Sequence, residues 1–78
     1  MASRPVAADT ARKPLGRWLL DRQRRDDIIG DLATAAKRDP LFPTDGDFDA
    51  ISRRLSVVGA EPDMHEALEM AELDWAAI

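Results

Sequence analysis

The chain has no cysteine, a single histidine and no glycine-rich stretch among its 78 residues. Without cysteine it can form neither a disulfide nor a thiolate metal site, and this composition is typical of a reducing cytoplasm. His65 cannot build a zinc site without carboxylate ligands, and the sequence contains no HExxH spacing. We therefore expect a cytoplasmic protein that is not an enzyme and that uses no cofactor and no metal.

Long apolar runs are also missing. No stretch approaches the roughly 20 apolar residues that a membrane-spanning helix needs. Residues 1–13 lack the apolar segment of a secretory signal and show neither helical nor strand periodicity. We expect residues 1–13 to form a flexible tail and residues 14–78 to form a single helical domain that does not associate with membranes.

Charge is distributed unevenly along the chain. Residues 61–78 hold six acids and neither Lys nor Arg, whereas residues 1–25 hold seven basic residues and two acids. Such a separation can steer a partner or favour head-to-tail association of weak homo-oligomers. The net charge of −4 argues against general nucleic-acid binding, for which a basic domain is the usual signature.

Apolar side chains recur at the spacing of amphipathic helices in four segments, with no alternation typical of strands. Pro14 and Pro62 fit the first helical position, where a missing N–H is harmless. Asp26 or Asp27 is expected to cap the second helix, and Gly59 to end the third in a left-handed conformation. The expected helices cover residues 14–22, 28–38, 48–58 and from 62 onward.

The apolar stripes should meet in one core. Gly30 interrupts the second stripe, and we attribute it to close approach of a neighbouring helix or of the Trp18 ring. Asp45, Asp47 and Asp49 alternate as in a calcium loop but lack its glycine and final glutamate, so we interpret them as turn and capping residues. The expected core residues are Trp18, Leu19, Ile28, Ile29, Leu32, Phe42, Phe48, Ile51, Leu55, Leu68 and Trp75.

Several short motifs carry a resemblance to a known family. They are Trp18-Leu19-Leu20, Ile29-Gly30-Asp31-Leu32-Ala33, Asp39 and Phe42-Pro43. In this pattern the chain resembles the YozE-like family of small bacterial proteins over about residues 14–58. The resemblance implies an all-α bundle of four or five short helices, similar to a sterile alpha motif domain. It implies no catalytic residues, because the family has no assigned activity. The chain departs from the family at Pro14-Leu15-Gly16, where an aromatic residue is usual.

The charge pattern predicts a non-catalytic protein-interaction module. Glu66, Glu69 and Glu72 lie on a segment without basic residues, so we expect them to bind a basic partner protein. The same face can instead meet the basic end of another copy of the chain. A monomer or a weak homo-oligomer is expected.

Two alternatives remain open at this point. The first is nucleic-acid binding through basic residues gathered at one end of the bundle. Its candidate residues are Arg12, Lys13, Arg17, Lys37 and Arg38. The second is a small regulator or inhibitor of mobile-element origin, whose acidic last helix mimics nucleic acid.

Overall fold

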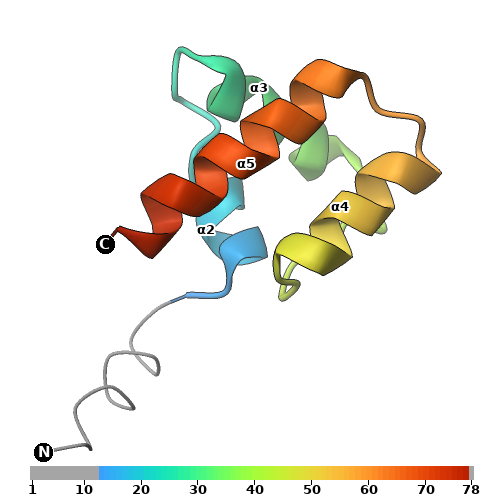
Figure 1. The fold of residues 1–78 in the computed structure, drawn as a ribbon, viewed down its shortest axis with the longest axis horizontal. Helices are drawn as coiled ribbons and strands as arrows, with labels where there is room; N and C mark the ends of the chain where they lie inside the picture. Colours follow the sequence, from blue (N-terminus) through green and yellow to red (C-terminus); the bar gives the residue numbers. More distant parts are fainter. Residues whose placement is uncertain (1–12, 78) are drawn as a thin grey trace, which may run out of the picture.

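The computed structural model describes residues 13–77, which form four helices and no strand (Figure 1). The helices are α2 (Leu15–Leu20), α3 (Ile28–Arg38), α4 (Phe48–Val57) and α5 (Pro62–Ala76). This arrangement confirms the all-α bundle expected from the sequence. Ile78 and the expected tail lie outside the described residues, except for Lys13. Within residues 13–77, no helix combines the length and apolar character that crossing a bilayer requires.

The last helix, α5, organises the packing of the others. It contacts α2, α3 and α4, and its largest interface is with α3. The backbones of α3 and α4 do not pack directly against each other. In Figure 1, α5 crosses in front of α2 and α3, while α4 lies to one side. The space between α3 and α4 is therefore closed by side chains and by the segment that connects the two helices.

Most of the expected core is buried, but three of its members lie at the edge. Ile28, Phe48 and Trp75 are half-buried, because each stands at or near the end of a helix. Four alanines belong to the core instead, on the facing sides of α3 and α5, where small side chains allow close approach. The buried apolar residues are Leu15, Trp18, Leu19, Ile29, Leu32, Ala33, Ala36, Phe42, Ile51, Leu55, Ala67, Leu68 and Ala71.

The first helix is shorter than expected. Pro14 is its N-cap and not its first residue, because Pro14 has a ψ of 150° and only its carbonyl joins the helix, accepting a bond from the Trp18 N–H. The helix ends at Leu20, and the chain continues through turns to Arg25. The N–H of Arg25 donates to the Arg22 carbonyl at 3.0 Å, which is a turn bond and not an α-helical one.

Gly30 has a different reason from the one expected. A Cβ atom at this position would clash with the carbonyl oxygen of Arg25. The close neighbour is thus the backbone of the α2–α3 connection, and neither another helix nor the Trp18 ring. The connection can fold back tightly over the first turn of α3 only because residue 30 has no side chain.

The other helix ends follow the expected chemistry. Asp27, the second of the two candidates, caps α3, and its carboxylate accepts from the Gly30 N–H at 3.1 Å. Gly59 follows α4 with a φ of 70°, which confirms the expected left-handed conformation. Pro62 is the first residue of α5, also as expected.

Candidate functional site

A shallow, open hollow of about 320 Å³ lies between the start of α4 and the end of α5. Asp47, Phe48 and Asp49 line it from α4, and Glu72 and Trp75 line it from α5. We call this space the aromatic hollow. Asp47 is fixed there as the N-cap of α4, because its carboxylate accepts from the Ala50 N–H at 3.0 Å. Two aromatic rings and three carboxylates therefore share one concave site.

The expected partner-binding glutamates extend from this hollow along α5. Glu72 is half-buried at the hollow, while Glu69 and Glu66 are exposed. Spacings of three residues place the three side chains along one ridge of a helix. Together with Asp47 and Asp49 they form what we call the acidic surface. None of these five residues forms an ion pair within residues 13–77.

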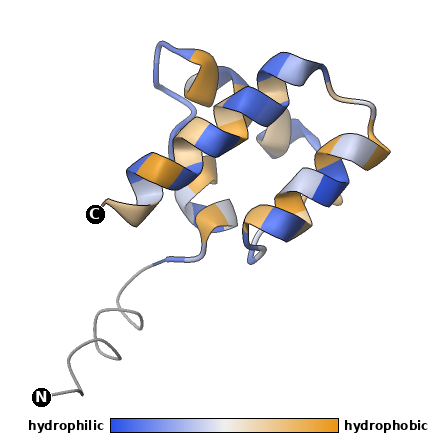
Figure 2. Ribbon diagram, viewed as in Figure 1, coloured by the Kyte–Doolittle hydropathy of each residue, from blue (hydrophilic) through white to orange (hydrophobic). Residues whose placement is uncertain are grey.

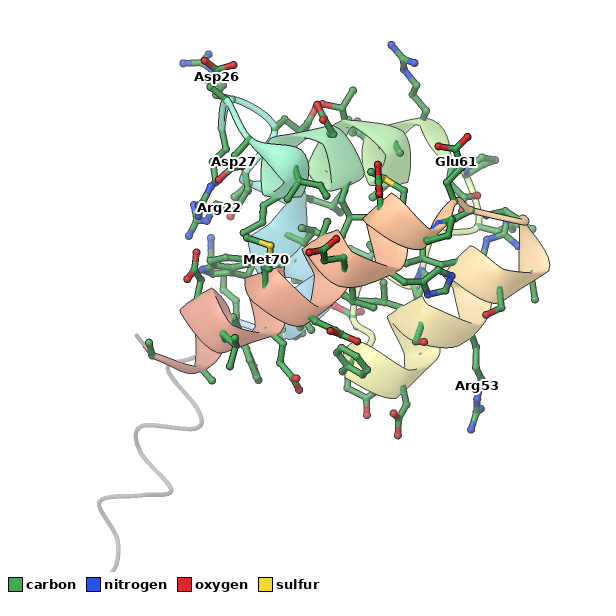
Figure 3. All side chains as sticks on the ribbon, turned by 45° about the horizontal axis from the view of Figure 1, so that its top comes forward. Arg22, Asp26, Asp27, Arg53, Glu61 and Met70 are labelled. Carbon is green, nitrogen blue, oxygen red and sulfur yellow. The ribbon has the colours of Figure 1, made fainter. Side chains whose placement is uncertain are left out.

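Two large apolar side chains of α5 are also exposed. Leu73 is 71% exposed and Met70 is 42% exposed. Figure 2 shows hydrophilic and hydrophobic residues alternating along the whole of α5, and Figure 3 shows Met70 at the edge of this helix next to the α2–α3 connection in that view. A partner on this helix would thus meet apolar area as well as charge.

One acid of α5 is neutralised within the bundle. Asp74 accepts from Nη1 of Arg25 at 3.0 Å, so a cation from the α2–α3 connection supports the C-terminal part of α5. The same guanidinium bonds Asp27, which lowers the pKa of that carboxyl, and the cap bond from Gly30 lowers it further. Arg25 therefore connects the start of α3 with the end of α5.

The structure separates the candidate basic residues. Arg12 lies outside the described residues. Lys13 pairs with Asp21 at 2.6 Å, and Arg17 pairs with Asp45. Lys13 and Arg17 line one shallow hollow beside Leu20. These partners lower the pKa values of Asp21 and Asp45, each first through its hydrogen bond with the cation.

Lys37 and Arg38 lie at the C-terminal end of α3, exposed and without an ion pair in the described part of the chain. Arg38 lines a separate apolar groove of about 260 Å³. It does not line the hollow beside Lys13. The structure therefore shows no single basic hollow that holds all four described candidates.

The apolar groove lies where α3 and α4 fail to pack directly. Beside Arg38, its lining residues are Leu32, Ala35, Ala36, Asp39, Phe42, Leu55, Val58, Ala60 and Met64. The lining residue Asp39 is held by Arg54 of α4, whose guanidinium donates to both of its carboxylate oxygens at 2.7 Å. This two-bond pairing lowers the pKa of Asp39.

A metal site would need several His, Asp or Glu side chains close together. His65 is half-buried in the first turns of α5. Among residues 13–77, no three His, Asp or Glu side chains gather closely enough to hold a metal ion, including the carboxylates of the aromatic hollow. Comparison with known proteins adds no assignment, since no family model, curated protein or solved structure matches the chain.

The sequence alone did not identify the α4 half of this site. Asp47 and Asp49 were interpreted as capping residues, and Phe48 and Trp75 as core residues. A signal was nevertheless present. Phe48 starts one helix and Trp75 is near the end of the next, and two helices joined by a short connection usually run antiparallel, which brings such positions together.

Proposed function

We propose that this chain is a non-catalytic protein-interaction module whose acidic surface binds a basic partner protein. The observation that carries the proposal is the aromatic hollow, in which two rings lie among three carboxylates. Carboxylates pair with the cations of Lys and Arg, and aromatic faces attract the same cations. Because α5 contains neither Lys nor Arg, its unpaired acids can be neutralised only by cations from other segments or molecules.

Nucleic-acid binding has weaker support among the described residues. Lys13 and Arg17 already pair with aspartates, which leaves Lys37 and Arg38 as the exposed cations of that candidate set. If the alternative holds, DNA or RNA should be retarded in a gel at about 50 mM salt and released as salt is added. Absence of retardation would remove it.

A narrower version of the proposal concerns the type of partner. A small regulator or inhibitor of mobile-element origin would use the same acidic surface to imitate nucleic acid and capture a nucleic-acid-binding protein. The ridge of Glu66, Glu69 and Glu72 supports this version, because regularly spaced charges on a helix can imitate a row of phosphates.

We also propose kinship with the YozE-like family and its sterile-alpha-motif-like fold, in a cytoplasmic protein. The support comes from burial of the motif: Trp18, Ile29, Leu32 and Phe42 are all core residues. Motif residues in a core indicate shared packing and say nothing about a shared activity. Interaction through an exposed surface is compatible with that kinship.

Charge reversal along α5 tests the proposed function. The probe is a synthetic amphipathic helical peptide rich in Arg and Lys, titrated by fluorescence anisotropy. Replacing Glu66, Glu69 and Glu72 together by Lys should weaken binding by about 10- to 100-fold, because each exposed pair contributes up to about 1 kcal/mol. Unchanged binding by this triple variant would contradict the proposal.

A matched control separates the acidic surface from net charge. The double variant Glu69→Lys/Glu72→Lys changes the charge as much as Asp26→Lys/Asp31→Lys does. Asp31 is exposed on α3, and Asp26 points away from the bundle at the tip of the α2–α3 connection (Figure 3). Only the first pair should weaken binding, with helix content checked by circular dichroism. Equal losses in both would mean that net charge alone attracts the probe.

A further inference from the structure

The two ends of the described chain are joined through Trp75, one of the residues that line the aromatic hollow. The indole Nε1–H of Trp75 donates to the backbone carbonyl of Lys13 at 2.7 Å, across 62 residues of sequence. The side chain of Lys13 is held separately, by its 2.6 Å pairing with Asp21. In Figure 1 the start of the described chain passes close to the C-terminal end of α5. Both the backbone and the side chain of residue 13 are therefore fixed beside a ring that lines the hollow.

This placement brings Arg12 within reach of the hollow. Consecutive Cα atoms are about 3.8 Å apart, so Arg12 begins one such step from a residue that Trp75 already holds. The preceding segment is also long enough to follow α5. Eleven steps from residue 1 to residue 12 span up to about 37 Å when extended, whereas a helix of 15 residues such as α5 is roughly 22 Å long.

The chemistry of the segment complements that of the hollow. Residues 1–12 contain Arg4 and Arg12 against the single acid Asp9. The hollow contains three carboxylates and two aromatic rings, and those carboxylates do not converge as metal ligands would. A guanidinium suits such a site because its planar array of donors can reach separate carboxylates while its face lies on a ring.

We propose that residues 1–12 dock on the aromatic hollow, with the guanidinium of Arg12 against Trp75 and the carboxylate of Glu72. The segment then competes with a basic partner for the acidic surface, and this consequence rests on the function proposed above. The docking itself does not, because it involves only this chain. A partner must displace the segment, so its apparent affinity falls by the fraction of molecules in which the hollow is open.

The test uses the full chain labelled with ¹⁵N. Arg12→Glu should shift the amide resonances of Phe48, Asp49 and Glu72, because it removes the cation and adds a repelled carboxylate. Arg12→Lys should largely retain the native resonances. The control is Arg24→Glu, an identical charge change at an exposed site in the α2–α3 connection that forms no ion pair within residues 13–77. Native resonances in Arg12→Glu, or equal shifts in both Glu variants, would overturn the docking.

Titration with the basic probe peptide separates this inference from the proposed function. If the segment covers the hollow in two-thirds of molecules, Arg12→Glu should bind the probe about threefold more tightly than Arg24→Glu does. Equal affinities of the two variants would overturn the competition. Shifted resonances in Arg12→Glu combined with no probe binding by any form would retain the docking and reject the proposed function.

Discussion

At the scale of single residues, Trp18 combines a buried ring with an indole N–H that lacks an acceptor in the described part of the chain. It is 5% exposed, and its Nε1–H donates to no acceptor among residues 13–77. The guanidinium carbon of Arg22 lies 4.3 Å from the ring centroid, so the ring also carries a cation–π contact. An unpaired buried N–H lowers stability by about 1–3 kcal/mol, which the apolar contacts of the ring must offset.

Trp18→Phe should therefore lower the stability of the protein far less than the smaller ring alone would predict. It removes the unpaired N–H together with part of the apolar area, and these effects oppose each other. We expect the free energy of unfolding in urea to stay within about 1 kcal/mol of the native value, whereas Trp18→Ala should lose about 3–5 kcal/mol. A loss near 3 kcal/mol for Phe would mean that the N–H has a partner in solution.

Residue-scale features were predictable where the chemistry is local. Asp27 and Gly59 act within one helical turn of their own positions, so the sequence predicted Gly59 outright and limited the α3 cap to Asp26 or Asp27. Gly30 was recognised as unusual, but its neighbour, the Arg25 carbonyl, depends on how the connection folds back. The spacing of apolar residues contains no information about that path.

At the scale of elements, the α2–α3 connection packs on α3 through Gly30. Gly30→Ala should gain about 1 kcal/mol in helix propensity but force the Arg25 carbonyl to move. Because a backbone atom cannot rotate aside, we expect a net loss of about 1–3 kcal/mol. Urea unfolding gives the loss, and amide resonances should change most around Arg25. A more stable Gly30→Ala protein would show that the α2–α3 connection can move without lowering the free energy of unfolding.

The helices were predicted well as separate elements, but their mutual arrangement was not. Periodicity located the four helices of residues 13–77, since it reflects local geometry. The position of α5 against α2, α3 and α4, and the lack of direct packing between α3 and α4, arise from long-range contacts. For the same reason Phe48 and Trp75 were assigned to the interior, whereas their positions at helix ends place them around the aromatic hollow.

At the scale of the whole molecule, aspartates pair with cations, some across many residues of sequence, as in Arg17–Asp45 and Arg54–Asp39, and one locally, as in Arg25–Asp27. Lys13, Arg17, Arg25 and Arg54 lower the pKa values of their partners, which are Asp21, Asp45, Asp27 and Asp39. A carboxyl whose pKa is lower in the folded state stabilises the fold above its unfolded pKa, near pH 4 for Asp. That contribution is lost as the pH falls through the folded pKa.

The urea midpoint should therefore be stable from pH 7 to about 5 and fall steeply below about pH 4. Asp39→Asn should reduce this acid sensitivity most among the four, because Asp39 and Arg54 have the least exposed side chains of these pairs, at 17% and 22%. Measuring the midpoint across pH for the native protein and this variant provides the check. A midpoint that stays constant down to pH 3 would show that the pairs do not stabilise the fold.

The bond from Trp75 to Lys13 also holds the two ends of the folded segment near each other. A segment whose ends lie near each other can be inserted into a surface loop of an unrelated host protein without separating the host residues on either side. Residues 13–77 thus have the geometry of an insertable cassette, which would carry its acidic surface outward from whichever scaffold received it.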